Sequence, residues 1–300
     1  MLAITGCSGL VGHYLCDELV ARGIPFKLLG RSVNNKSLPI SSSFCFYDLS
    51  KPIDNSLRLF LEDVDIFIHL AALLPSSGSH LIDFFSLNSV ASKNLFDLCS
   101  EVGVRNFIYF SSANLLSPLE NGIVSTDSNY SFSLRQAPYL SSKIAAELLL
   151  LNSHGLTDLS IVRPSSIYGH NVRSGLFRNI YNSFTQSKPI RLTHNGLWSA
   201  DYIYAGDVAK CLVSLIEQRT PGIFTLGSGI ASSIHQVAKS FASILSVDED
   251  LIILEPFAED QTTIGSLPSV SSNQVTSLLG RKPFSLVEGL RHAIGTYASF

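Results

Sequence analysis

Tyr139 and Lys143 are four residues apart in the stretch Pro138–Asn152, whose apolar residues recur with helical spacing. On a helix this separation places both side chains on one face, so that an ammonium group can lie beside a phenol. A free tyrosine titrates at about pH 10 and is a poor base at neutral pH, but a nearby cation favours the phenolate. We therefore predict that the pair exchanges a proton with an alcohol or a carbonyl compound. Such pairs also arise by chance, so their place in the fold has to supply the specificity.

Ser111 and Ser112 lie at the carboxyl end of a predicted strand, Phe107–Ser111. In open α/β sheets ligands bind at this edge, so a hydroxyl there could hydrogen-bond the reacting oxygen. A strand-end cap is the alternative role for either serine. The sequence offers neither a partner histidine nor a nucleophile elbow, and a serine hydrolase is therefore not indicated.

The segment Thr5–Gly12 has glycines at positions 6, 9 and 12, between an apolar strand and the first predicted helix. Backbone N–H groups at a helix N-terminus favour a bound pyrophosphate. Gly6 permits a tight turn, Gly9 lets the backbone approach phosphate, and Gly12 allows close packing of the helix. We predict a dinucleotide site rather than an ordinary strand–helix turn, because strand, turn and helix follow in the required order.

The second predicted strand runs into Leu28–Ser32 without the carboxylate that usually holds the adenosine ribose of NAD. Arg31 instead offers a guanidinium that can bind a 2′-phosphate in a fork. This favours NADP(H) over NAD(H) as the cofactor, and a solvated loop arginine is the alternative. Asp48, after the third strand, is predicted to accept a hydrogen bond from the adenine amino group or to be an ordinary turn aspartate.

Charge and composition argue against several classes of function. The chain carries 21 Lys and Arg against 24 Asp and Glu, so it has no excess of cations for binding nucleic acid. Its apolar runs are too short for a membrane span, and no signal peptide is indicated before the first strand. The five cysteines are scattered and the eight histidines form no metal-like pattern, so we expect reduced thiols, no metal and a cytoplasmic protein. His69, at a strand end, is expected to be a packed histidine.

Alternating apolar runs and helical patterns in the first half indicate βαβ units. We predict an α/β fold with a Rossmann-like, doubly wound parallel sheet and a smaller, mixed α/β C-terminal substrate lobe. The expected division is a dinucleotide-binding domain over residues 1–168 and a mainly substrate-binding lobe over residues 169–300, with segments near 200–226 returning to the first domain. The predicted strands of the sheet are Leu2–Thr5, Phe26–Gly30, Phe44–Tyr47, Ile66–Leu70, Phe107–Ser111 and Ser160–Arg163.

The other predicted elements position these strands and build the second lobe. Glycine or proline marks several helix ends. A long loop over Ser117–Ser133 is predicted to be a lid. Helices are predicted over 10–22, 87–102, 138–152, 176–186, 207–220 and 233–246 and from residue 286, and further strands over 189–192, 223–226 and 252–255.

These motifs, in this order, resemble the extended short-chain dehydrogenase/reductase superfamily, and within it the NAD(P)-dependent epimerases, dehydratases and reductases that act largely on nucleotide sugars. The resemblance covers the chain nearly end to end and implies Ser112, Tyr139 and Lys143 as the catalytic residues. The segments similar to the family motifs are Thr5–Gly12, His69–Ala72, Asn88 with Asn94–Leu95, Arg163–Gly169, Tyr204–Ala209 and Gly222–Gly229.

The resemblance also implies binding residues. Many family members have an arginine where this chain has Ala200, and another arginine could replace it. The implied substrate residues are Ser111, Asn114, Ser166, Arg173, Arg178 and Arg191. The implied cofactor residues are Gly6, Ser8, Gly9, Leu10, Val11, Gly12, Arg31, Asp48, Leu49, Leu70, Ala71, Ala72, Asn88, Tyr139, Lys143, Pro164 and Ile167.

Hydride transfer at a carbon bearing a hydroxyl or keto group is the activity that the resemblance implies. Family dehydratases carry an acid directly after the catalytic serine or threonine, but here Ala113 and Asn114 follow Ser112, which disfavours dehydration. We expect a nucleotide-sugar epimerase or a 4-keto-sugar reductase. The alternatives are an NADPH-dependent carbonyl reductase on a non-nucleotide substrate and a non-catalytic NADP-binding regulatory protein. A homodimer is left open as the assembly.

Overall fold

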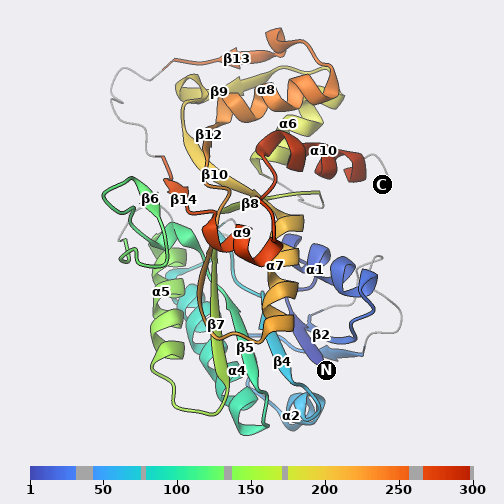
Figure 1. The fold of residues 1–300 in the computed structure, drawn as a ribbon, viewed down its shortest axis with the longest axis vertical. Helices are drawn as coiled ribbons and strands as arrows, with labels where there is room; N and C mark the ends of the chain where they lie inside the picture. Colours follow the sequence, from blue (N-terminus) through green and yellow to red (C-terminus); the bar gives the residue numbers. More distant parts are fainter. Residues whose placement is uncertain (32–42, 76–78, 132–136, 171–174, 257–265, 298–300) are drawn as a thin grey trace.

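A seven-stranded parallel sheet forms the centre of the molecule (Figure 1). The computed structural model describes residues 1–31, 43–75, 79–131, 137–170, 175–256 and 266–297. The strand order is β11-β7-β5-β4-β1-β2-β3, and every neighbouring pair is parallel, which confirms the predicted fold class. Along the chain these strands are β1 (Leu2–Thr5), β2 (Phe26–Gly30), β3 (Phe44–Phe46), β4 (Ile66–His69), β5 (Asn106–Phe110), β7 (Asp158–Pro164) and β11 (Gly222–Leu226).

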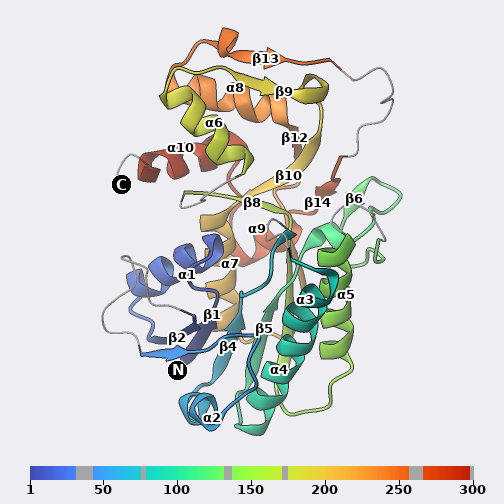
Figure 2. The same cartoon turned by 180° about the vertical axis from the view of Figure 1, so that it is seen from behind.

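Helices cover both faces of this sheet, as the two opposite views in Figures 1 and 2 show. On one face α1 packs against α7, and α9 packs on α7. The other face carries α2, α4 and α5, whose apolar side chains share one core cluster. The bounds are α1 (Leu10–Ala21), α2 (Asn55–Leu61), α4 (Ala91–Glu101), α5 (Ala137–Leu151), α7 (Ala205–Gln218) and α9 (Asn273–Leu279).

The apolar runs of the central strands are continuous because both faces of the sheet are buried. Successive side chains of a strand point to opposite faces, and β4 illustrates this alternation. Ile66 and Ile68 pack into the cluster with α1 and α7, whereas Phe67, between them, packs with α4 and α5. The sequence of β4 is therefore a continuous apolar run, as expected for a parallel strand buried on both faces, rather than an alternation of apolar and polar residues.

The order of the strands reverses beside β1, since β2 and β3 continue on one side of it and β4, β5, β7 and β11 on the other. The crossover connections leave a crevice outside the carboxyl ends of the strands at such a point, and ligands bind there in open α/β sheets. The glycine turn, the end of β4 and the end of β5 all meet at this edge.

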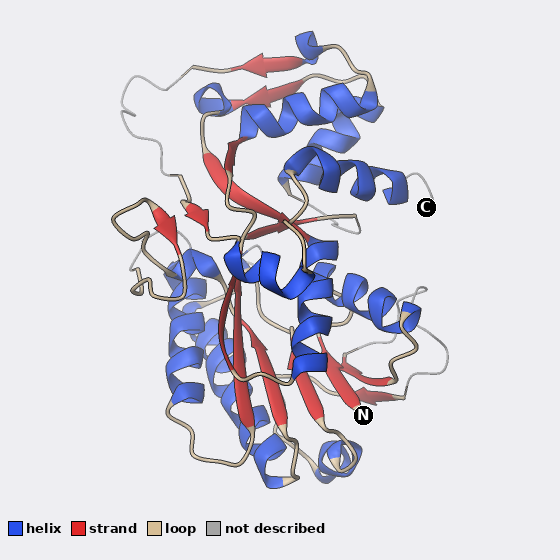
Figure 3. Ribbon diagram, viewed as in Figure 1, coloured by secondary structure: helices blue, strands red, loops and turns tan. Residues whose placement is uncertain are grey.

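A smaller lobe lies above this edge of the sheet (Figure 3). It contains the three-stranded sheet β12-β10-β8 and the parallel pair β13-β9. Helix α8 begins with a capping box, in which Ser233 and Gln236 satisfy each other's backbone N–H groups. The elements of the lobe are β8 (Ser166–Tyr168), α6 (Leu176–Thr185), β9 (Ile190–Leu192), β10 (Ser199–Tyr204), β12 (Ala231–Ser233), α8 (Ile234–Leu245), β13 (Ile252–Leu254) and α10 (Leu286–Tyr297).

Several elements differ from the sequence prediction. The predicted loop over Ser117–Ser133 contains the short strand β6 (Ile123–Val124), which pairs with β14 (Ser269–Val270) from far along the chain. The predicted helix over 87–102 begins earlier, with α3 (Leu81–Phe84) and a π-helical turn (Phe85–Val90) before α4. Elements α2, β8, β10, β12 and α9 were not predicted. Within the described ranges, no helix combines the length and the apolar character that crossing a membrane requires.

Candidate active site

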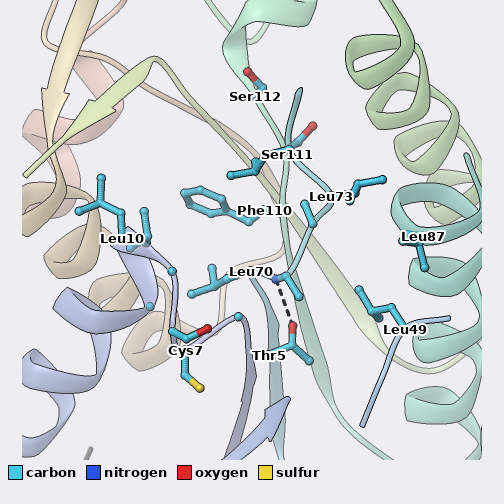
Figure 4. Close-up of a pocket in the computed structure, with 18 of the residues that line it drawn as sticks. Thr5, Cys7, Leu10, Leu49, Leu70, Leu73, Leu87, Phe110, Ser111 and Ser112 are labelled. Carbon is cyan, nitrogen blue, oxygen red and sulfur yellow. Dashed lines mark hydrogen bonds between the residues drawn. The ribbon is translucent and has the colours of Figure 1, made fainter. Parts of the chain in front are cut away.

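A cavity of about 610 Å³ opens at the carboxyl ends of the strands, where the sheet meets the start of β8 (Figure 4). Most of the predicted site residues line it, although they come from segments far apart in the sequence. The predicted residues that the structure brings together here are Gly6, Ser8, Gly9, Leu10, Val11, Gly12, Arg31, Asp48, Leu49, Leu70, Ala71, Ala72, Ser111, Ser112, Asn114, Tyr139, Lys143, Pro164, Ser166 and Ile167.

The glycine turn leaves no room for side chains at two positions. Gly6 has a φ of +74°, and a Cβ there would lie 2.6 Å from the backbone nitrogen of Ala71. A Cβ on Gly12 would overlap the carbonyl oxygen of Gly6, so this glycine packs the helix onto the turn itself rather than onto the strand. Thr5 Oγ1 accepts a hydrogen bond from the Ala71 N–H at 3.3 Å, which Figure 4 marks. The turn thus lies against the end of β4 with its backbone facing the cavity, an arrangement that fits a dinucleotide.

The far end of the cavity carries the predicted adenosine contacts. Arg31 and Asp48 both line it, together with Tyr47, which the sequence analysis did not identify. Asp48 accepts a hydrogen bond from the backbone N–H of Ser50 at 2.9 Å, and this bond holds the pKa of its carboxyl below the usual range. Asp48 therefore caps its own turn and also faces the cavity, so both of its predicted roles are compatible with the geometry.

Tyr139 and Lys143 both line the cavity from the first turns of α5. Lys143 is buried, and its ammonium group donates to the carbonyl oxygen of Phe110 at 2.7 Å and to the hydroxyl of Tyr109 at 3.2 Å. The same ammonium lies 4.6 Å from the centre of the Tyr109 ring. An ammonium has three N–H donors, so these two bonds leave one N–H of Lys143 for a further acceptor.

The structure corrects the predicted effect of the lysine on the tyrosine. Burial raises the pKa of Tyr139 to about 12, and burial lowers the pKa of Lys143 to about 7. The reason is that the ammonium is directed at Phe110 and Tyr109, while the phenol of Tyr139 is desolvated. At neutral pH Tyr139 is accordingly a protonated phenol, which suits it to donate a proton to a carbonyl oxygen.

The two serines after β5 have different environments. The hydroxyl oxygen of Ser112 accepts a hydrogen bond from the backbone N–H of Asn114 at 3.2 Å, which leaves its O–H as a donor toward the cavity. The hydroxyl of Ser111 is buried and has no hydrogen-bond partner within the described part of the chain. Figure 4 shows the two hydroxyl groups pointing in different directions above Phe110. Ser112 thus also caps the end of the strand, which the sequence analysis gave as its alternative role.

Asn88 does not line the cavity, contrary to the prediction that it contacts the cofactor. Its buried side-chain amide accepts from the Leu73 N–H at 2.7 Å and donates to the Leu73 carbonyl oxygen at 3.1 Å. Its second N–H donates to the hydroxyl of Ser142 at 3.0 Å. Because these bonds occupy the amide, Asn88 positions the segment after β4 against the helix that carries Tyr139 and Lys143.

Of the predicted substrate arginines, Arg178 and Arg191 do not line the cavity. Arg178, on α6, lies over the ring of Tyr181 at 5.9 Å, and Arg191, on β9, pairs with Glu255 at the surface at 3.3 Å. Arg173 lies outside the described residues. Ser165 was missed by the sequence analysis, yet it lines the cavity and donates to the buried carboxylate of Asp201 at 3.0 Å. The sequence shows Asp201 beside Ala200, but it does not show which residues hydrogen-bond to the Asp201 carboxylate.

His69 is a packed histidine, as predicted. Its ring is fully buried, with Nδ1 2.7 Å from Thr5 Oγ1 and Nε2 2.9 Å from Ser92 Oγ. Burial lowers its pKa to about 3, so the ring is neutral near pH 7. The described residues contain no group of three or more His, Cys, Asp or Glu that could hold a metal ion.

A family profile and several known proteins match the chain. The profile of the NAD dependent epimerase/dehydratase family matches residues 2–227. A Bacillus subtilis protein described as an uncharacterized UDP-glucose epimerase is 27% identical over 235 residues, which are 72% of each chain. A UDP-N-acetyl-alpha-D-glucosaminuronate decarboxylase of Bacillus cytotoxicus is 23% identical and is matched over 85% of this chain and 86% of its own.

Solved structures share the fold over the whole chain. MoeE5, solved in complex with UDP-glucuronic acid and NAD, has a TM-score of 0.80 at 24% identity, with 100% of this chain and 99% of that one covered. The UDP-N-acetylglucosamine 4-epimerase of Methanobrevibacter ruminantium has a TM-score of 0.83 at 20% identity, with 99% and 98% covered. At these identities the likeness establishes the fold.

Proposed function

Because the chain belongs to the NAD-dependent epimerase/dehydratase family, we propose that it transfers a hydride at a hydroxyl- or keto-bearing carbon of a nucleotide sugar. The product would be the epimer or, if reduced cofactor is consumed, the reduced 4-keto sugar. The observation that carries this proposal is that Ser112, Tyr139 and Lys143 line the same cavity as the glycine turn. The curated relatives described as UDP-sugar epimerases and decarboxylases support a nucleotide sugar as the substrate class.

Each of the three residues has a distinct role in the proposal. The nicotinamide would supply the hydride chemistry when bound. Tyr139 exchanges the proton of the reacting oxygen, and its raised pKa favours the phenol that donates to a carbonyl. Ser112 donates its free O–H to the same oxygen and stabilises the charge that develops there. Lys143 directs its remaining N–H toward the bound ligand.

We further propose NADP(H) as the preferred cofactor. The support is local, because Arg31 lines the end of the cavity that follows β2 and β2 ends without a carboxylate. Several of the structures with this fold were solved in complex with NAD, so a nicotinamide cofactor is common to both possibilities. A preference for NADP(H) over NAD(H) would come from binding of the 2′-phosphate by the Arg31 side chain.

The lobe over residues 169–300 is proposed to hold most of the nucleotide sugar, with the dinucleotide on residues 1–168. The position of the lobe supports this division, because it lies above the carboxyl ends of the strands (Figure 3), and β8, whose Ser166 and Ile167 line the cavity, pairs with β10 of the lobe. The segment Ala205–Leu226 belongs to the first domain in this proposal, since α7 packs on α1 and β11 pairs with β7.

A homodimer is the assembly that we propose. Helix α5 exposes three large apolar side chains, Leu148, Leu149 and Leu151, on the outside of the sheet domain. An exposed apolar face on a helix is typical of an interface between protein chains. Light scattering should give twice the monomer mass for the unmodified protein, and a monomer mass would exclude this assembly.

Turnover assays test the proposed function. The purified protein is incubated with oxidised cofactor and UDP-glucose or UDP-N-acetylglucosamine, or with reduced cofactor and a UDP-4-keto sugar, and the sugar products are identified by NMR. An epimerase yields the C4 epimer with no net change in cofactor, whereas a reductase consumes one reduced cofactor per keto sugar. Reduction of simple ketones, without conversion of any nucleotide sugar, would contradict the proposal. Mass spectrometry of molecules that co-purify with the protein identifies a retained cofactor or nucleotide.

A further inference from the structure

A buried ion pair lies one helical turn beyond the lysine of the candidate active site. Glu147 is fully buried on α5 and receives the guanidinium of Arg163, whose Nε is 3.1 Å from both carboxylate oxygens and whose Nη2 is 2.5 Å from Oε2. The hydroxyl of Tyr130 donates to the same Oε2 at 2.8 Å. Three donors hold this carboxylate, namely Nε and Nη2 of Arg163 and the hydroxyl of Tyr130. A buried carboxylate is costly to leave unpaired.

Lys143 needs a counter-charge because it is buried. Its two hydrogen-bond partners, the Phe110 carbonyl and the Tyr109 hydroxyl, are neutral and supply none. The titratable groups around it are Tyr139 and Glu147 on α5, Tyr109 on β5 and His69 on β4. Of these Glu147 is the one carboxylic acid, and the guanidinium of Arg163 on β7 also faces it. Residues four apart on a helix are neighbours, so its carboxylate lies on the face that carries Lys143.

We propose, building on the proposed function, that Glu147 is a positioning residue for the reaction, and that its buried carboxylate supplies the counter-charge of the Lys143 ammonium. Burial lowers the pKa of Lys143 to about 7, and the charge of Glu147 acts in the opposite direction. Without Glu147 the lysine would lose its proton at lower pH, and the site would lose the cation that donates to Phe110 and Tyr109.

The partners of Glu147 connect it to the walls of the cavity. Arg163 directly precedes Pro164, which lines the cavity at the end of β7. Tyr130 lies at the end of the segment that leaves β5 after Ser112, and this segment is closed by a bridge between Leu116 and Tyr130. One carboxylate thus joins the helix of Tyr139 and Lys143, the strand before Pro164 and the segment after Ser112.

The test is the pKa of Lys143 itself, measured by NMR on protein with ¹³C-labelled lysine side chains and assigned with Lys143→Arg. Glu147→Gln should lower the pKa of Lys143 by about one unit or more, because it removes an opposite charge within the range where such shifts occur. Glu147→Asp keeps the charge and should retain most of the pKa. Glu101→Gln removes a carboxylate from an exposed pair with Arg58 and should change nothing.

The pH profile of turnover gives a second measurement. Its alkaline limb should move to lower pH in Glu147→Gln and stay in place in Glu147→Asp. If Glu147→Gln does not fold because Arg163 is left unpaired, the double variant Glu147→Gln/Arg163→Met takes its place and is compared with Arg163→Met, because loss of the Arg163 cation by itself raises the pKa of Lys143. A folded variant that lacks the carboxylate but keeps the pKa of Lys143 would overturn the inference.

The two measurements separate the inference from the proposed function. The NMR titration uses the protein without substrate, so it reports on Glu147 even if no nucleotide sugar is converted. Absence of turnover in the unmodified protein would contradict the proposed function alone.

Discussion

At the scale of single residues, the account rests on hydrogen-bond donors that remain free at the cavity. Ser112 accepts a hydrogen bond from the Asn114 backbone, so its O–H is available to a ligand oxygen. Lys143 uses two of its three donors on Phe110 and Tyr109. Preorganised donors of this kind stabilise developing charge without reorganisation during the reaction. Tyr139, a buried phenol, is the group from which the proton would come.

In this account, the preference for NADP(H) over NAD(H) depends on the side chain of Arg31. Arg31→Asp should weaken NADPH binding much more than NADH binding, because the new carboxylate repels a 2′-phosphate and can accept from ribose hydroxyls. Fluorescence titration with both cofactors measures the two affinities. Lys51→Asp makes the same charge change outside the cavity lining and is the control. An equal loss of affinity for both cofactors in Arg31→Asp would remove the basis for preferring NADP(H).

At the scale of elements, the site depends on how the segment after β4 is fixed. Asn88 lies in a π-helical turn, a distortion that is frequent at functional sites, and joins the backbone of Leu73 to Ser142 on α5. Ser89 donates to the carbonyl oxygen of Ser142 at 2.7 Å and adds a second tie to the same helix. These hydrogen bonds tie the helix of Tyr139 to the cavity wall.

Breaking this tie should cost both stability and activity. Asn88→Ala leaves the Leu73 N–H and carbonyl without their partner and should lower the free energy of unfolding by about 2 kcal/mol. Urea denaturation measures this change, and kcat/KM should fall with it because Leu73 and Tyr139 line the same cavity. Asn152→Ala removes an exposed asparagine at the end of α5 and should stay within about 0.5 kcal/mol. Equal stabilities of the two variants would refute the positioning role of Asn88.

His69 makes the packing of β4 sensitive to pH. Its pKa is lowered from 6.5 to about 3 by burial, so the unfolded chain takes up this proton before the folded protein does. Stability from this residue is complete above pH 6.5 and is lost as the pH falls through the range down to about 3. Between about pH 7.5 and about pH 5 the contribution is about 2 kcal/mol.

The measurement is the free energy of unfolding of the unmodified protein and of His69→Gln at both pH values. The variant lacks the titrating ring, so its stability should fall less between the two conditions. If acidification lowers the stability of both proteins by the same amount, His69 does not carry this pH dependence.

At the scale of the whole molecule, the sequence was most informative about the parallel sheet. Strands β1 and β2 were predicted with their observed bounds, because each is a short apolar run that ends at a turn. Strand β10 was missed because Asp201 interrupts it, and that buried carboxylate accepts from the Ser165 hydroxyl and from the N–H groups of Ser228, Gly229 and Val270. Such partners lie 27 to 69 residues away and have no local signature.

The same limit applies to the site. Its glycine turn, Ser112, Tyr139 and Lys143 could be predicted, because each follows from a local motif at a predicted strand or helix end. The role of Asn88 could not, because it depends on Leu73 and Ser142, which are 15 and 54 residues away. The direction of the pKa change of Tyr139 was predicted wrongly, because burial is a property of the folded molecule.

The most direct test of the central claim compares the rate of hydride transfer in the unmodified protein and in Tyr139→Phe. Each protein is mixed with a nucleotide sugar, and the absorbance of the reduced nicotinamide reports the transfer. Phenylalanine keeps the ring but cannot exchange a proton, so transfer should fall by about 10²-fold or more while the cofactor still binds. Equal rates of transfer in the two proteins would show that Tyr139 is not the proton donor.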